Sequence, residues 1–218
     1  VERLGIEAVN TARKTIAGLV KHEQGGIVAF NNRGWARRGL VELPWKDEDN
    51  NSCFIGENGQ TLHSQLVERN GEKRLVVETD EVPAYGYRFF PRRAGQETKL
   101  STSLHVDKHH LENELVSVHL NGLGQIDSMV LKASQRQVLP PGKVGNVLQL
   151  FEDRPLSGEA WEIDIFYQDK LTELGAPDEW EAEENGPLRG VIRLKWNIHA
   201  NTQKQIRAAE PAFYLLYR

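Results

Sequence analysis

The start of the chain carries the pattern of an amphipathic helix. Apolar residues recur mostly at intervals of three or four: Val1, Leu4, Ala8, Ala12, Ile16, Leu19 and Val20. This spacing lines one face of a helix, and Gly25 and Gly26 mark its end. Because a single helix cannot bury its own stripe, it either packs on the region that follows or is the last helix of a bundle. We assign residues 1–24 to this element.

From Gly26 the pattern changes to short apolar runs separated by turn residues. The runs cover residues 27–30, 40–43, 53–55, 62–67, 75–77 and 85–90. Asn58-Gly59 and Asn70-Gly71 are dipeptides typical of tight turns between antiparallel strands. Strands of this length and spacing predict a small antiparallel β-sandwich at residues 25–95.

A second β region is predicted after the polar stretch at residues 91–99, which we interpret as a linker or a long loop. Apolar runs predict strands at residues 111–120, 126–131, 147–151, 161–167 and 188–198, with a long acidic loop at 169–186. The apolar tail at 213–217 predicts a sheet edge that continues beyond the chain or is completed by another chain. The fold class is therefore mainly β, with residues 96–218 as a second β domain.

Charge and cysteine content narrow the function classes. Lys and Arg number 27 and Asp and Glu 31, which gives a formal net charge of -4. Nucleic-acid binders concentrate positive charge, so this balance argues against one. No apolar run approaches the roughly 18–20 residues that cross a bilayer, which argues against a membrane protein. Cys53 is the single cysteine. It allows neither an internal disulfide nor a cysteine-paired zinc site and suggests a reducing, cytoplasmic location.

The most suggestive cluster of metal-ligating residue types is His105, Asp107, His109 and His110. On a strand, residues 105, 107 and 109 would share one face. Histidine and aspartate are ligands that suit zinc. His105, Asp107 and His109 are therefore metal candidates, and a solvated polar strand edge is the alternative.

Acidic residues gather around an aromatic residue later in the chain. Trp161 lies within the carboxylate-rich set Glu152, Asp153, Glu159, Glu162 and Asp164. Glycoside hydrolysis uses paired carboxylates, and an aromatic ring can stack on a sugar, so this segment is a candidate sugar site. The alternative is an acidic loop at the end of two strands. The sequence contains no GxSxG, GxxxxGK[ST], GxGxxG or HExxH motif.

Five stretches, taken in order, resemble the middle and C-terminal part of the α-mannosidases of glycoside hydrolase family 38, in its cytosolic and bacterial subgroup. They are IVAFNNRGWARRGLVELP (27–44), VPAYGYRFF (82–90), LENELVSVHLNGLGQIDSMV (111–130), GNVLQLFEDRPLSGEAWEIDIFY (145–167) and NGPLRGVIRL (185–194). The resemblance is colinear from residue 1 to about 207. After Gln205 the sequence departs from the family pattern.

The resemblance implies both a fold and a role. The opening helix would end the family's helical bundle, residues 25–95 would form a small sandwich, and 96–218 would begin a larger galactose-mutarotase-like sandwich. The whole enzyme would be a retaining, zinc-dependent hydrolase of terminal α-mannosides, with zinc or another divalent metal and the nucleophile in an N-terminal α/β domain. No residue of this chain matches those catalytic motifs. The chain would therefore serve as a scaffold and form the rim of the sugar site, with the N-terminal α/β domain as its partner.

The family's β region lends a loop to the edge of the mannose site, and the corresponding positions are Asp153, Trp161 and Asp164. Two other classes of function remain open. One is a free-standing carbohydrate-binding module with Trp161 as its platform. The other is a structural assembly domain whose helix at residues 1–20 docks a partner, and a homo-oligomer is one such assembly.

Overall fold

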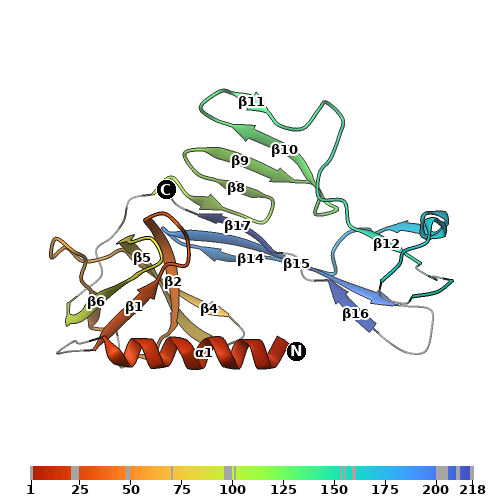
Figure 1. Ribbon diagram of the computed structural model, residues 1–218. Helices are drawn as coiled ribbons and strands as arrows, with labels where there is room; N and C mark the ends of the chain where they lie inside the picture. Colours follow the sequence, from red (N-terminus) through yellow and green to blue (C-terminus); the bar gives the residue numbers. More distant parts are fainter. Residues whose placement is uncertain are drawn as a thin grey trace. The chain divides into compact units, whose positions relative to one another are not determined.

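The computed structural model (Figure 1) describes residues 2–20, 25–47, 50–69, 71–95, 100, 102–152, 154, 156–158, 161–199, 206–209 and 212–216. The chain divides into two compact units, Val1–Ser101 and Thr102–Arg218. Both are built from antiparallel strands, which confirms the mainly β prediction. Among the described residues, no helix has the length and hydrophobicity needed to cross a bilayer.

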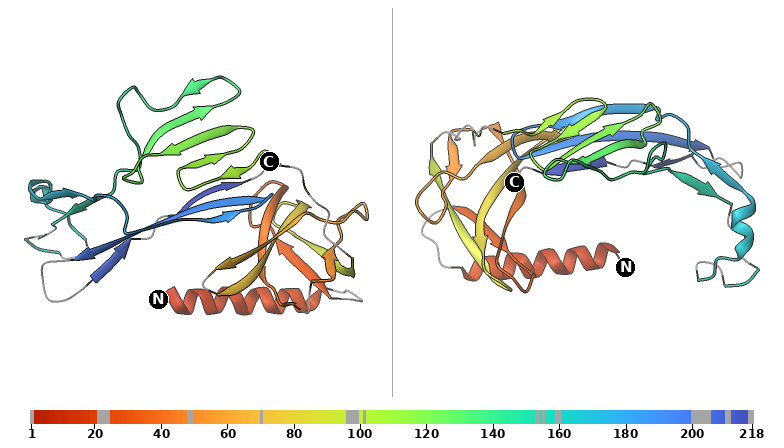
Figure 2. Two further views of the ribbon diagram at one scale, coloured as in Figure 1. Left: turned by 180° about the vertical axis from the view of Figure 1, so that it is seen from behind. Right: turned by 90° about the horizontal axis from the view of Figure 1, so that it is seen from above.

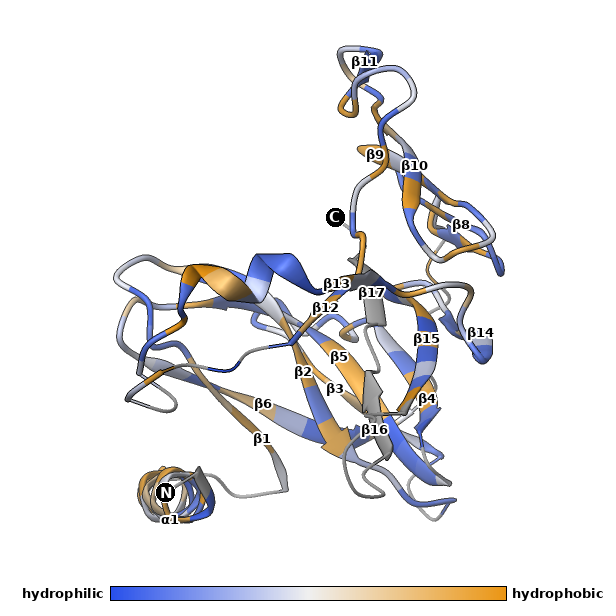
Figure 3. Ribbon diagram, turned by 90° about the vertical axis from the view of Figure 1, so that its right-hand side faces the viewer, coloured by the Kyte–Doolittle hydropathy of each residue, from blue (hydrophilic) through white to orange (hydrophobic). Residues whose placement is uncertain are grey.

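Helix α1 spans Glu2–Leu19, as predicted from its periodicity. Its apolar stripe is open: Leu4 and Ile16 are exposed, and Leu19 is 77% exposed. Figure 3 looks along α1 and shows hydrophobic and hydrophilic residues on different sides of it. In the described part of the chain, the helix is therefore not buried against the β region that follows. Of our two sequence interpretations, packing on that region is not observed.

Unit 1 is a sandwich of two three-stranded sheets. One sheet has the order β1 (Gly26–Phe30), β6 (Tyr87–Ala94), β3 (Ser52–Phe54), and the other β2 (Arg37–Pro44), β5 (Glu72–Val82), β4 (Ser64–Arg69). Phe54 and Phe90 from the first sheet share one core with Leu75 and Val77 from the second. The hairpin predicted between β4 and β5 is present, and Gly71 has the positive φ of 75° that its turn requires.

The stretch at 91–99 is not a linker throughout, because β6 continues to Ala94. Its last residues pair with β3, with Phe54 opposite Arg92 and Cys53 opposite Arg93. Backbone pairing needs no apolar side chains, and the guanidinium of Arg92 lies 5.3 Å from the ring centroid of Trp45. The charged residues here show no apolar alternation, so the sequence did not predict this part of the strand.

Unit 2 combines a five-stranded sheet with the long strand β15 (Arg189–His199) and its neighbours. The five-stranded sheet is ordered β11 (Arg136–Gln137), β10 (Ile126–Leu131), β9 (Val116–Leu120), β8 (His110–Glu112), β7 (His105–Val106). Strand β15 pairs with β14 (Glu179–Asn185), β16 (Ile206–Ala209) and β17 (Ala212–Leu216), and Figure 2 shows β14 and β15 side by side. Val106 and Leu111 pack in one core with Ile192 and Leu194.

Three local predictions in unit 2 are wrong. The acidic loop expected at 169–186 contains β13 (Leu171–Glu173), paired with β12 (Gln149–Phe151), and all of β14. The strand expected at 161–167 is a turn followed by the 3-10 helix η2 (Ile165–Asp169). The strand expected at 111–120 is two strands, because the Asn113 side chain accepts hydrogen bonds from the backbone N–H groups of Leu115 and Val116 and turns the chain.

Candidate functional site

The β7–β8 hairpin gathers metal-ligating side chains on one face of the five-stranded sheet. His105 lies opposite Glu112 in the register, and the N–H of Asp107 donates to the carbonyl of His110 at 2.9 Å. Val106 and the residue opposite it are buried on the other face. Ligand atoms of His105, Asp107 and His110 all lie within 4.8 Å of one another.

Hydrogen bonds keep the two carboxylates of this hairpin ionised. The backbone N–H of His109 donates to Asp107 Oδ1 at 2.8 Å and is the main reason that the pKa of Asp107 lies below its ordinary value. The Lys132 ammonium donates to Glu112 and is the main reason that the pKa of Glu112 is lowered. His105 Nε2 lies 3.6 Å from Asp107 Oδ2. The hairpin therefore offers anionic oxygen and imidazole nitrogen together.

The two-residue period of a strand predicted that His109 would share a face with His105 and Asp107. In the structure His109 is not part of this cluster. Its Nδ1 is 3.1 Å from the carbonyl oxygen of Leu120, and its ring centroid is 4.5 Å from that of Trp180. The turn held by the Asp107 carboxylate interrupts the two-residue period before residue 109. His110, at the start of the next strand, takes the place in the cluster that alternation had given to His109.

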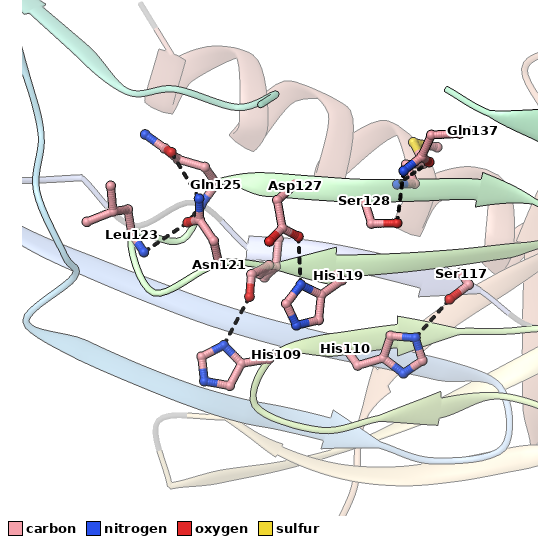
Figure 4. A network of polar contacts seen from close by, with 12 residues as sticks. His109, His110, Ser117, His119, Asn121, Leu123, Gln125, Asp127, Ser128 and Gln137 are labelled. Atoms are coloured by element: carbon pink, nitrogen blue, oxygen red, sulfur yellow. Dashed lines mark hydrogen bonds and ion pairs between the residues drawn. The ribbon is translucent and has the colours of Figure 1, made fainter. Parts of the chain in front are cut away.

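The polar face continues onto the neighbouring strands β9 and β10 (Figure 4). His110 Nε2 lies 2.8 Å from Ser117 Oγ, and His119 Nδ1 lies 2.6 Å from Asp127 Oδ1. Ser117 had no signal in the sequence that tied it to the histidines, since only the pairing of β8 with β9 brings it near His110. Glu112 lies two residues from His110 on β8 and therefore shares its face.

The sugar-rim candidates lie around η2. Trp161 is 92% exposed, and Asp164 Oδ2 accepts a hydrogen bond from the backbone N–H of Leu156 at 2.7 Å. Asp153 lies outside the described residues. In Figure 3 the start of η2 is hydrophobic, and Ile163, Ile165 and Phe166 are all exposed. This segment therefore presents apolar side chains that the described part of the chain leaves uncovered.

The carboxylates around Trp161 are not assembled into an acid–base pair in the described residues. Glu152 is bound by Lys170 and Arg154. The hydrogen bond from Lys170 is the main cause of the lowered pKa of Glu152. A carboxylate held ionised by two cations is a poor general acid. The segment is therefore better suited to contact another molecule or domain than to transfer protons.

Comparison with known proteins shows similarity to one family. Residues 111–211 match the model of the glycosyl hydrolases family 38 C-terminal domain. The chain is 25% identical over 184 residues to α-mannosidase G of Dictyostelium discoideum, covering 78% of this chain and 16% of that protein. It is 36% identical over 94 residues to human α-mannosidase 2C1, covering 43% of this chain and 9% of that protein.

A solved structure supports the same architecture. An α-mannosidase from Enterococcus faecalis V583 superposes with a TM-score of 0.53 at 16% identity, covering 87% of this chain and 28% of that one. The β-rich fold is thus shared with part of that protein. The second unit thus resembles the C-terminal domain of glycosyl hydrolase family 38, and the chain is similar to portions of α-mannosidases, as its motifs predicted. It spans less than a fifth of the length of the curated relatives described above.

Proposed function

We propose that this chain is the β region of a retaining α-mannosidase that hydrolyses terminal α-mannosides and takes part in mannose metabolism. The single observation that carries the proposal is the family 38 match at residues 111–211, alongside α-mannosidase relatives several times longer than this chain. The nucleophile and the zinc or other divalent metal of the whole enzyme are assigned to an α/β domain outside these residues, which is the partner of this chain. The free, buried Cys53 supports a cytoplasmic location.

Within that enzyme, we assign the segment around η2 to the rim of the sugar site. Trp161 supplies an exposed indole face, and rings of this kind stack on the apolar faces of sugars. Asp164 fixes the loop by accepting from the N–H of Leu156, so its role is to position Trp161 rather than to bind substrate. Asp153 is the remaining rim candidate. The exposed apolar residues Ile163 and Phe166 would contact the catalytic domain.

The stripe of α1 fits the same proposal. An apolar helix face that the described residues leave open needs partners, and the end of a helical bundle supplies them. We therefore assign Leu4, Ile16 and Leu19 to contacts with preceding helices of the whole polypeptide.

The test uses the full-length polypeptide and a chromogenic α-mannoside. We expect turnover by the full-length protein and none by the 218-residue chain. Trp161→Ala should lower kcat/KM, whereas Trp35→Ala, a matched control at an exposed tryptophan of unit 1 (62% exposed), should leave it unchanged. Equal kinetics for the two variants would overturn the rim assignment, and an inactive full-length protein would overturn the enzyme assignment.

A further inference from the structure

We propose that His105, Asp107 and His110 form a binding site for a divalent transition-metal ion, for which Zn²⁺ is the best match. Two imidazoles and one carboxylate are a ligand set that zinc uses in sites with an open fourth position for water. The three residues precede the segment that matches the family model, which begins at residue 111. The proposal does not rest on the proposed enzymatic function.

The spacing of the ligand atoms is close to what tetrahedral zinc requires. Zinc lies about 2.0–2.1 Å from nitrogen and oxygen ligands, which places two ligand atoms of a tetrahedron about 3.4 Å apart. His105 Nε2 and Asp107 Oδ2 are 3.6 Å apart. All ligand atoms of the cluster lie within 4.8 Å of one another, so small side-chain rotations, chiefly of the exposed His105, bring them to this spacing.

Neighbouring polar groups orient His110. Its Nε2 lies 2.8 Å from Ser117 Oγ and 3.5 Å from Glu112 Oε2, as Figure 4 shows for the serine. Metal-ligating histidines commonly use one ring nitrogen for such a hydrogen bond, which leaves the other nitrogen for the metal. Lys132 also belongs to this network, and its ion pair with Glu112 offsets the repulsion that it would exert on a bound ion.

The backbone that carries the three ligands is anchored in the core of unit 2. Val106 and Leu111 are buried beneath the ligand face, at 2% and 3% exposure, and both belong to the core shared with β15. The Asp107 carboxylate also accepts from the N–H of His109, which closes the turn between the strands. A ligand set on a packed hairpin loses less entropy on binding than one on a mobile loop.

The experiment is calorimetric titration of ZnCl₂ into the 218-residue chain, with circular dichroism to verify the fold of each variant. We expect saturable one-to-one binding, and absorption bands of tetrahedral cobalt when Co²⁺ replaces zinc. His110→Ala and His105→Asn should each abolish this binding. Glu112→Gln should weaken the binding by about 10-fold, as is typical of residues that hydrogen-bond to a metal ligand. His109→Gln is the matched control and should bind like the parent chain.

Three outcomes would overturn the site. They are the absence of one-to-one binding, its retention in a folded His110→Ala or His105→Asn chain, or its loss in a folded His109→Gln chain. His105 lies on the edge strand β7 and is exposed, so its replacement should not prevent folding. The result with His105→Asn therefore decides the question if His110→Ala does not fold. Mannosidase activity of the full-length polypeptide is a separate readout, so the two proposals can fail independently.

Discussion

The contact between Gly190 and Val106 holds strand β7 against strand β15, and it yields a sharp stability prediction. A Cβ atom added at Gly190 would lie 2.1 Å from Val106 Cγ2, whereas ordinary contacts begin near 3.4 Å. Val106 is β-branched and 2% exposed, so its side chain has little room to rotate. Gly190→Ala must therefore displace the backbone of β7 or β15.

We expect Gly190→Ala to lower the free energy of unfolding of unit 2 by about 1–3 kcal/mol, the range typical of an overpacked core. Gly122→Ala is the matched control, because nothing lies within 4 Å of its new Cβ. Hydrogen exchange of the backbone amides of unit 2 measures this free energy separately from that of unit 1.

A double-mutant cycle tests the cause. Val106→Ala alone should destabilise unit 2, because it removes buried methyl groups. Combined with Gly190→Ala it should cost less than the sum of the two single changes, since the shorter side chain makes room for the new methyl group. Additive costs, or a Gly190→Ala chain as stable as Gly122→Ala, would refute the packing that we describe.

The remaining predictions concern buried polar groups. Glu184→Gln should cost about 3 kcal/mol, because it leaves the largely buried guanidinium of Arg189 (11% exposed) without its bidentate carboxylate partner at 2.7 and 2.8 Å. Urea unfolding measures this loss. Asn31→Ala should cost about 1–3 kcal/mol in the same assay, because the Asn31 amide donates to three backbone carbonyls. Cys53 is buried, and a thiol reagent should label it only at the rate at which unit 1 opens.

Each of these predictions has a defined contrary result. Glu179→Gln breaks a solvent-exposed pair with Lys195 and should cost less than about 1 kcal/mol; an equal cost for Glu184→Gln would mean that its pair is solvated. An Asn31→Ala chain as stable as the parent would mean that water replaces the amide. Labelling of native Cys53 at the rate of a free thiol would contradict its burial.

The sequence predicted the features that depend on local patterns. The helix at residues 2–19 followed from its period, and the β4–β5 hairpin followed from an Asn-Gly dipeptide between two apolar runs. Strand β14 was missed because its glutamates looked like loop residues. They are strand residues because Lys195 and Arg193 on β15 pair with Glu179 and Glu183, and these partners lie at least ten residues away in sequence.

The candidate metal cluster could be predicted only in part. His105 and Asp107 share a face because they are two residues apart in an extended segment. The third member could not be chosen from the sequence, since alternation favours His109 while the observed turn brings in His110. A side-chain hydrogen bond of one aspartate therefore decided which histidine joins the cluster.

The packing of β7 and the proposed metal site depend on the same residue. Val106 stands between His105 and Asp107, and its side chain points away from theirs into the core of unit 2. Any shift of Val106 that accommodates a methyl group at residue 190 moves both ligand positions, and a displacement of about 1 Å is enough to spoil a preorganised site. Gly190→Ala should therefore weaken zinc binding as well as folding, even though residue 190 touches no ligand. Gly122→Ala should weaken neither zinc binding nor folding. Zinc affinity should therefore be highest in the parent chain and Gly122→Ala, lower in Gly190→Ala and lowest in His110→Ala.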